Sequence, residues 1–400
     1  RFRTLLPMTN SKPIENGQLI VEQGRIQEVF PDTSFPVKGE LIDLSDCLVC
    51  PGFVNAHCHL SLSVLKDRIS YRDQFADWVR SMIEENKIAS QANRIFAMHA
   101  QAKIMSRSGV TGLVDFISQE ELAAEYVKFP FRQTLFLEVL GFLPSLAVPM
   151  AETSESFLKK NLNKFSLIKW GLAPHAPYSV SSSLFREVKR LANRYKFPLS
   201  CHVAEFYEEL QLLKDGSGNM KSLLVELGMY DDKWIPPAES PVRYLDSLGV
   251  LDSLVAVHLN LAEGDLDILK SRKVKAIFCP QSTRWFQREH YMPVRDLLDR
   301  KIVVGLGTDS LASNKSLSFL DEIRAADQML ADVSQEEILF MATRGGAEAV
   351  GMDCGVIEEG RPADLIGFRV REHCDDWYGV PFEPGRIEAD FVMVDGEKVF

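Results

Sequence analysis

The chain has 400 residues, of which 46% are hydrophobic and 25% charged, and its 45 basic and 56 acidic residues give a formal net charge of −11. These fractions are typical of a globular protein with one large domain or two unequal ones, and they exclude a disordered chain, a collagen and a coiled coil. The longest apolar runs are far shorter than the roughly 18 to 20 residues of a membrane-spanning helix. The acidic balance, without a long basic block, argues against a nucleic-acid partner and favours a small molecule.

The first residues and the cysteines indicate the cellular compartment in which we expect the protein. The first residues, Arg1-Phe2-Arg3, lack the charged, then apolar, then small pattern of a signal peptide. Seven cysteines, an odd number spread over a long chain, are typical of reduced and mostly buried thiols. We therefore expect a cytoplasmic protein with reduced thiols and no membrane partner.

Both ends of the chain carry hairpin patterns. Residues 17–29 alternate apolar and polar side chains around a Gln-Gly turn, and residues 391–400 form two short apolar runs around an Asp-Gly turn. Neither end has enough apolar surface to fold alone. Because domain termini often lie close together, we expect residues 1–51 and 353–400 to pair into one small β-sandwich-like domain.

Residues 52–352 alternate strand-like apolar runs with longer helical patterns, which is typical of βα units around a parallel sheet. Eight such runs can be counted, the first of them starting just before this region: Cys50–Ala56, Val110–Phe116, Gln133–Val139, Leu167–Ala173, Leu199–Ala204, Leu254–Asn260, Val274–Cys279 and Ile302–Thr308. The pattern predicts an α/β fold, a (β/α)8 TIM barrel with its catalytic site at the C-terminal strand ends. The alternative, a doubly wound open sheet, lacks a G-x-G-x-x-G motif after the first strand. The long connection 206–253 has the length of a substrate cover.

Side chains that can bind a metal follow four of the predicted strands. His57 and His59 lie two positions apart at the end of the first strand, so both face the same side. His202 ends the fifth strand, His258 the sixth, and Asp309 the eighth. Imidazoles combined with a carboxylate suit Zn²⁺ and tolerate Fe²⁺. The sequence therefore predicts one divalent metal ion per chain, zinc before iron, at the mouth of the barrel.

A further carboxylate, Glu205, comes three residues after His202. A carboxylate beside a metal ion but not captured by it can take a proton from the attacking water and pass it to the substrate. Asp309 could bind the ion and also accept a hydrogen bond from that water. We therefore predict catalytic roles for Glu205 and Asp309.

At these residues the sequence resembles the amidohydrolase superfamily, in particular its cytosine deaminase-like and chlorohydrolase-like aminohydrolases. The resemblance covers essentially the whole chain and is carried by several motifs: Pro51-Gly-Phe-Val-Asn-Ala-His57-Cys-His59-Leu, His202-x-x-Glu205, His258, Cys279-Pro280-x-Ser282, Gly307-Thr-Asp309-Ser, Ala312-Ser-Asn314 and Gly355-Val-Ile-Glu-Glu-Gly360-Arg-Pro-Ala-Asp364. It implies a mononuclear site with the following ligands: His57, His59, His202 and Asp309. It also implies that Glu205 is the proton shuttle and that His258 holds the attacking hydroxide or the leaving group.

A sister branch of this superfamily uses two metal ions, bridged by a carboxylated lysine at the end of the fourth strand. In this chain the strand ends at Gly171-Leu-Ala-Pro-His175, and the nearest lysine, Lys169, lies early in it. One ion is therefore predicted, and a second ion would make His258 a ligand.

Candidate substrate contacts are predicted near the same strand ends and, for Trp78, on a covering helix over residues 75–82: Trp78, Glu138, His175, Arg284, Trp285 and Ser310. His175 ends the fourth strand, where related nucleoside aminohydrolases have a histidine that contacts the substrate. Glu138 ends the third strand, where a structural ion pair is an equal alternative. Arg284 and Trp285 follow the seventh strand and could meet a substrate carboxylate and an aromatic ring.

A mononuclear site with a shuttle glutamate suits hydrolytic deamination of a heterocycle, with release of ammonia. The sequence looks most like adenine-nucleoside deaminases, first aminodeoxyfutalosine deaminases and then the S-adenosylhomocysteine or methylthioadenosine group. The S-adenosylhomocysteine or methylthioadenosine group has an arginine after its third or fourth strand, and this chain has no match for that arginine. The usual Cys-Pro-Arg-Ser-Asn motif appears in this chain as Cys-Pro-Gln281-Ser-Thr283. The alternatives are hydrolysis of another C–N or C–Cl bond, of guanine, cytosine or triazine type, and an inactive barrel that serves as a binding protein. By analogy with relatives, a homodimer is expected.

Overall fold

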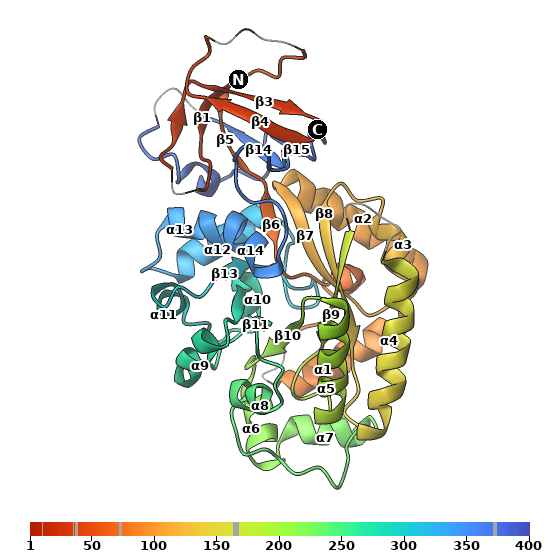
Figure 1. Ribbon diagram of the computed structural model, residues 1–400. Helices are drawn as coiled ribbons and strands as arrows, with labels where there is room; N and C mark the ends of the chain where they lie inside the picture. The colour runs from red at the N-terminus through yellow and green to blue at the C-terminus, as the bar shows by residue number, and fades with distance from the viewer. Residues whose placement is uncertain (10, 35, 37–38, 72–73, 163–167, 371–373) are drawn as a thin grey trace.

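The computed structural model describes residues 1–9, 11–34, 36, 39–71, 74–162, 168–370 and 374–400 (Figure 1). Its strands are β1 (Phe2–Leu5), β2 (Ile14–Glu15), β3 (Gln18–Glu22), β4 (Arg25–Phe30), β5 (Leu44–Pro51), β6 (Phe53–Asn55), β7 (Val110–Ile117), β8 (Arg132–Val139), β9 (Ile168–Pro174), β10 (Ser200–Val203), β11 (Val255–His258), β12 (Lys275–Phe278), β13 (Val304–Leu306), β14 (Leu365–Arg369), β15 (Phe391–Val394) and β16 (Glu397–Lys398).

The helices mostly follow the strands of the central part of the chain. They are α1 (Phe75–Ile88), α2 (Gln91–Arg107), α3 (Ala123–Tyr126), α4 (Ala147–Asn161), α5 (Ser182–Tyr195), α6 (Tyr207–Asp215), α7 (Asn219–Glu226), α8 (Pro241–Ser247), α9 (Leu266–Ser271), α10 (Pro280–Trp285), α11 (Val294–Asp299), α12 (Phe319–Met329), α13 (Gln335–Phe340) and α14 (Gly346–Val350). In the part of the chain that the structure describes, none of these helices is both long enough and apolar enough to cross a bilayer.

Helix α5 illustrates how local sequence sets the helix ends. The side chain of Ser181 accepts a hydrogen bond from the amide of Leu184 at 3.2 Å, which caps the first turn. The helix stops at Tyr195 because Lys196 takes a left-handed conformation with φ of 57°. Between these ends, apolar side chains at helical spacing are buried against the strands, as the sequence pattern predicts: Leu184, Phe185, Val188, Leu191 and Ala192.

The central strands form two parallel sheets of four strands each, in the orders β6-β7-β8-β9 and β10-β11-β12-β13. Hydrogen bonds join the two sheets at both edges. The amide of Leu172 donates to Pro198 O at 3.1 Å, and that of Ala56 donates to Leu306 O at 2.8 Å. Each of the eight predicted strands overlaps an observed one; the first residue of the fourth, Leu167, lies outside the described residues.

The first predicted strand, Cys50–Ala56, is wrong as a single element. Its first two residues belong to β5, and Gly52 separates β5 from β6. This position has room only for glycine, because a Cβ atom on Gly52 would lie 2.0 Å from Thr111 Oγ1. Buried side chains of strands from both sheets fill the space between them, together with residues of α14: Val54, Val114, Phe116, Phe136, Ala173, Val257, Ile277, Ala347 and Val350.

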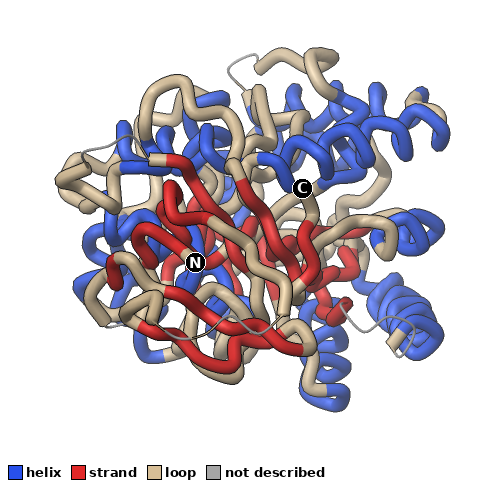
Figure 2. Tube along the Cα trace, turned by 90° about the horizontal axis from the view of Figure 1, so that it is seen from above, coloured by secondary structure: helices blue, strands red, loops and turns tan. Residues whose placement is uncertain are grey.

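Strands from both ends of the chain share one mixed sheet, in the order β16-β15-β14-β5-β1-β2. Both termini lie in this part of the molecule (Figure 1), and Figure 2, viewed from that end, shows strands in the middle with helices around them. The predicted hairpins are present, β3 with β4 and β15 with β16. Their turns touch, since a Cβ on Gly24 would lie 2.6 Å from Asp395 O. The β3-β4 hairpin packs its apolar face onto the mixed sheet through Ile26.

All seven cysteines are free thiols, and six of them are buried, as the sequence predicts.

Candidate active site

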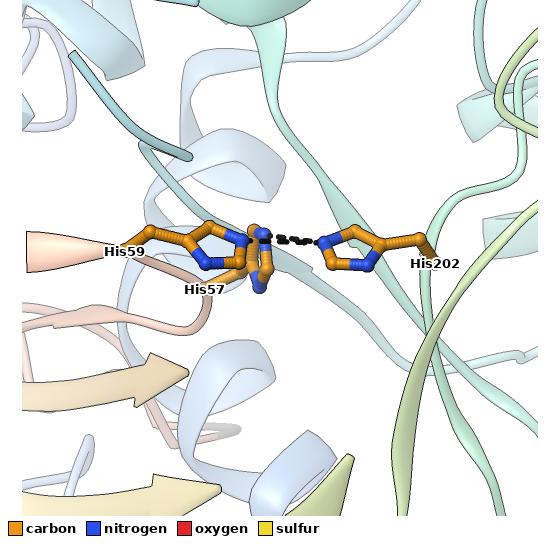
Figure 3. Close-up of side chains that lie close together, drawn as sticks. All are labelled: His57, His59 and His202. Atoms are coloured by element: carbon orange, nitrogen blue, oxygen red, sulfur yellow. Dashed lines mark hydrogen bonds between the residues drawn. The ribbon is translucent and has the colours of Figure 1, made fainter. Parts of the chain in front are cut away.

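Three histidines face one another at the C-terminal ends of two strands that lie far apart in the sequence. His57 and His59 follow β6, and His202 lies in β10. Figure 3 shows their Nε2 atoms converging; the Nε2 of His202 lies 3.3 Å from that of His57 and 3.3 Å from that of His59. Burial lowers the pKa of all three imidazoles, so each ring is neutral. Three neutral rings thus direct nitrogen atoms at one point.

The spacing of these atoms fits a metal ion. A tetrahedral zinc site with bonds of about 2.0 to 2.1 Å places its ligand atoms about 3.3 to 3.4 Å apart. The Nδ1 of His202 lies 3.0 Å from the carbonyl oxygen of His175 and can donate to it, which leaves the Nε2 lone pair free to bind a cation. Asp309 Oδ1 adds a carboxylate oxygen at 3.8 Å from His57 Nε2 and 3.9 Å from His59 Nε2.

The carboxylate of Asp309 is oriented by its neighbours. Its Oδ2 accepts hydrogen bonds from Ser282 Oγ at 2.7 Å and Ser313 Oγ at 2.9 Å, and its Oδ1 accepts one from the amide of Ser310 at 2.8 Å. These donors fix the carboxylate beside the histidine cluster. They also explain two of the sequence motifs, since Ser282 and Ser313 lie far apart in the chain and meet at one side chain.

Glu205 and His258 lie next to this cluster. The His258 Nε2 is 3.3 Å from Glu205 Oε1, and the His258 ring is nearly parallel to that of His202 with centroids 5.4 Å apart. Burial raises the pKa of Glu205 well above its usual value, and the guanidinium of Arg288 acts in the opposite direction. A carboxyl group in such surroundings can exist in both protonation states, which acid–base catalysis requires.

The backbone is strained where these side chains enter the site. Ala204, His258 and Asp309 have φ values of 53°, 76° and 58°, in the left-handed region that side chains other than glycine rarely adopt. Each of these residues ends or follows a parallel strand. Such strain persists at functional sites because the surrounding structure holds it in place.

A cavity of about 410 Å³ opens above the histidine cluster. The polar residues that line it include His59, Glu138, His175, His202, Glu205, His258, Asp309 and Ser310. The apolar wall comes from α1 and from α7 with the residues after it: Phe75, Trp78, Val79, Met82, Ile83, Met220, Leu223, Leu224, Leu227 and Met229. The long connection 206–253 therefore covers the cavity, as its length predicts.

Four of the six predicted substrate contacts line this cavity: Trp78, Glu138, His175 and Ser310. Trp78 is anchored by its indole N–H, which donates to Ala312 O at 2.9 Å. Glu138 Oε1 lies 3.9 Å from His175 Nε2 and has no hydrogen-bond partner among the described residues. Burial, with a smaller contribution from Asp115, raises the pKa of Glu138 to about 7. This buried oxygen beside the cavity therefore has unused hydrogen-bonding capacity.

Two predicted contacts, Arg284 and Trp285, are not brought to the cavity. The guanidinium of Arg284 is exposed and donates to Gln328 Oε1 at 2.8 Å. Trp285 packs beside Phe286, with ring centroids 4.9 Å apart. Both lie at the end of α10, whose buried face carries Ser282 and Thr283 instead. Their predicted roles have no support in the geometry.

Arg288 is a site residue that the sequence reasoning missed. Its side chain is 9% exposed and its Nη2 donates to Glu205 Oε1 at 2.9 Å. It lies in a polar run after α10 rather than at a strand end. The aromatic Phe286 two positions earlier was the one local sign that this run is not simply exposed.

The geometry does not support the alternative of two metal ions. Lys169 lies near the N-terminal end of β9, where its Nζ donates to Gly351 O at 3.3 Å. Among the described residues, the groups able to hold an ion are two, and both include His202: His57 with His59 and His202, and Glu138 with His175 and His202.

Comparison with known proteins agrees with this geometry. The model of the amidohydrolase family matches residues 48–398. The chain belongs to that family. It is 32% identical to a 5-methylthioadenosine/S-adenosylhomocysteine deaminase of Pelotomaculum thermopropionicum, over 96% of this chain and 88% of the relative.

Two solved structures share its fold. A Helicobacter pylori aminofutalosine deaminase in complex with methylthio-coformycin has a TM-score of 0.85 at 23% identity, over 100% of this chain and 98% of the other. An adenosine deaminase of Xanthomonas campestris with bound zinc has a TM-score of 0.84 at 23% identity, over 99% of this chain and 91% of the other. The family is metal-dependent, and the three histidines of this chain fit a single ion.

Proposed function

We propose that the protein is a metal-dependent hydrolase of C–N bonds that deaminates a purine-type nucleoside at an adenine ring and releases ammonia. The observation that carries this proposal is the convergence of three neutral histidines and Asp309 beside the Glu205–His258 pair, on the floor of a cavity with an apolar wall. The deaminase names of the relatives support the substrate class.

The fold proposal follows from the strand pairing. We infer that the two four-stranded sheets close into one (β/α)8 barrel, since they are hydrogen-bonded at both edges. We infer that residues 1–51 and 353–400 form the small β domain and residues 52–352 the barrel. The shared mixed sheet supports this division. A cytoplasmic location and a homodimer stay predictions.

One divalent ion, zinc, would be held by His57, His59, His202 and Asp309. Bound there, the ion would supply Lewis-acid chemistry and make a water molecule acidic enough to react near neutral pH. Two side chains of the site would bind that water. Asp309 and His258 both line the cavity, and both would exchange hydrogen bonds with an oxygen that attacks the substrate.

Glu205 would move the protons. Its carboxylate takes a proton from the attacking water and delivers it to a ring nitrogen of the adenine, while the water oxygen bonds to the carbon that carries the amino group. The second proton of the water reaches the amino group, the C–N bond breaks and ammonia leaves. The products are the 6-oxo purine nucleoside and ammonia, so one water is consumed for each turnover. His258 stabilises the oxygen as its charge changes.

The cavity lining suits a nucleoside. The apolar wall of α1 and α7 would cover the flat base and an apolar 5′ substituent, because it offers side chains such as Trp78, Met82 and Met220. Glu138 and His175, at the polar side of the cavity, would hydrogen-bond the ribose hydroxyls. Aminodeoxyfutalosine, the first candidate from the sequence, is a substrate of this adenine-nucleoside class.

The experiment is ammonia release by the metal-loaded protein from a panel of adenosine, 5′-deoxyadenosine, methylthioadenosine, S-adenosylhomocysteine, aminodeoxyfutalosine, guanine, cytosine and aminotriazines. We expect ammonia from at least one adenine nucleoside, and none after a chelator has removed the ion. Ammonia from guanine, cytosine or a triazine alone would replace the adenine assignment. No ammonia from any of these compounds would contradict the deaminase proposal.

A further inference from the structure

Arg288 is bound to two parts of one residue, Glu205. Its Nη2 donates to the carboxylate oxygen Oε1 at 2.9 Å, and its Nη1 donates to the backbone oxygen of Glu205. Among the described residues, its Nε has no hydrogen-bond acceptor. The polar contacts of this buried guanidinium are therefore directed at Glu205.

Two aromatic rings hold the guanidinium in place. Its central carbon lies 3.7 Å from the ring centroid of Phe206 and 4.7 Å from that of Phe286. Stacking on aromatic faces is a contact that arginine makes well, because its cation is planar and weakly hydrated. Phe206 also stacks on Phe75 of α1, so the support of Arg288 reaches the wall of the cavity.

The backbone of Glu205 is fixed as well. Its amide donates to Glu209 Oε2 at 2.8 Å, and its carbonyl oxygen accepts from Asn260 Nδ2 at 3.3 Å in addition to Arg288. Its Oε1 faces Arg288 and His258. Among the described residues no hydrogen bond reaches Oε2, and the side chain lines the cavity. One oxygen of the carboxylate is thus anchored, and the other is free to exchange a proton.

We propose that Arg288 is a positioning residue that clamps the Glu205 carboxylate by Oε1 and so presents Oε2 to the substrate; this role rests on the proposed deaminase function. A carboxylate without the clamp could rotate about its side-chain bonds and place neither oxygen at the right point. Misplacement of a proton-transfer group slows the chemical step and leaves substrate binding largely intact. Arg288 does not line the cavity, so it acts through Glu205.

The principal variant is Arg288→Met, because an unbranched apolar side chain can fill the space between Phe206 and Phe286 while it loses both hydrogen bonds. We expect kcat to fall about 10- to 100-fold with little change in KM, since partners that orient a catalytic group have effects of this size. The metal content should equal that of the wild type. A rise in KM with unchanged kcat would overturn the proposal, because Arg288 would then contact the substrate.

A double-variant cycle separates positioning from general packing. In the Glu205→Gln background, the positioning role predicts that Arg288→Met changes the residual rate by less than about twofold, because the group it orients is already disabled. A purely structural role predicts the same loss in both backgrounds, and that result would overturn the proposal. In the Arg288→Ala variant, added guanidinium at a non-denaturing concentration should restore part of kcat, whereas urea, its uncharged analogue, should not.

A structural readout keeps the test independent of turnover. Crystal structures of the wild type and Arg288→Met should show the Glu205 carboxylate moved or disordered in the variant alone; an unchanged carboxylate would overturn the clamp even if the protein deaminates no nucleoside. If Arg288→Met fails to fold, Arg288→Lys serves in its place, since lysine keeps the positive charge but has one donor nitrogen where the guanidinium uses two. Failure of the proposed function itself appears instead as a wild type that releases no ammonia.

Discussion

Two arginine–carboxylate pairs with buried carboxylates lie in different parts of the molecule, and the oxygens of the two carboxylates are used differently. Arg132, at the start of β8, donates to Asp364 Oδ2 at 2.8 Å, and the amide of Asp395 donates to Asp364 Oδ1 at 2.7 Å. Both oxygens of Asp364 are therefore bound. Arg288 donates to Oε1 of Glu205, and among the described residues Oε2 has no donor. Both oxygens of Asp364 thus accept hydrogen bonds from the protein, whereas within the described part of the chain only one oxygen of Glu205 does so.

On the proposed function, this difference separates a structural pair from one that serves catalysis. A carboxylate whose oxygens are all bound stabilises the elements it joins, which here are the start of β8 and the turn between β15 and β16. A carboxylate with an open oxygen leaves hydrogen-bonding capacity unused in the interior, at a cost in stability, and keeps it for a substrate proton. The left-handed backbone at Ala204 and His258 beside Glu205 fits the same interpretation.

The largest effect is expected from the histidine cluster. His202→Ala removes the ligand atom that lies 3.3 Å from both partners, so the variant should lose its ion and its turnover should fall by at least about 10⁴-fold, a small part of the acceleration that enzymes provide. Metal analysis and ammonia release measure both. The matched control is His99→Ala, an imidazole on α2 that pairs with Glu125. Full metal content in His202→Ala would contradict the ligand assignment.

The structural pair should respond with stability rather than rate. Asp364→Ala leaves the largely buried guanidinium of Arg132 without its main partner, and breaking such a pair costs about 3 kcal/mol. We expect the free energy of unfolding, measured with urea, to fall by about that amount, while kcat per folded molecule stays at the wild-type value. A variant with normal stability and reduced kcat would contradict the structural role of the Arg132–Asp364 pair.

A smaller, pH-dependent effect is expected at Glu138. Burial raises its pKa in the folded state from 4.5 to about 7. Its contribution to stability is therefore fully present below pH 4.5 and is lost as the pH rises through about 7. In the Glu138→Gln variant, the free energy of unfolding should fall less as the pH rises from 4.5 to about 7. At pH 8 the substitution should stabilise the protein by an amount on the order of 1 to 3 kcal/mol. Urea unfolding at pH 5 and pH 8 measures the difference, and an equal pH dependence in both proteins would refute it.

The sequence predicted those features that depend on position along a strand. His57, His59, His202, His258 and Asp309 are found together because side chains at the C-terminal ends of parallel strands share one edge, whatever their distance in the chain. Apolar runs locate such ends well. The hairpins at both chain ends were predictable for a similar reason, since their turn residues set the local conformation.

The features that the sequence did not predict depend on contacts between residues that lie far apart in the chain. Arg288 was missed because its burial results from Phe206 and Phe286, and its partner Glu205 is 83 positions away. The position of Arg284 after a strand predicts a site residue, but α10 begins at once and its helical period turns that side chain to solvent. The close approach of Thr111 to Gly52, at the break between β5 and β6, is likewise a contact that no local pattern reveals.

The most direct test of the account is the rate of ammonia release by Glu205→Gln, measured against the wild type on the same adenine nucleoside at equal metal content. Glutamine keeps the size of the side chain and can accept the hydrogen bond from Arg288, but it cannot take up a proton. The account predicts a rate about 10² to 10⁴-fold lower with the ion retained. A variant that holds its ion and releases ammonia at the wild-type rate would contradict it.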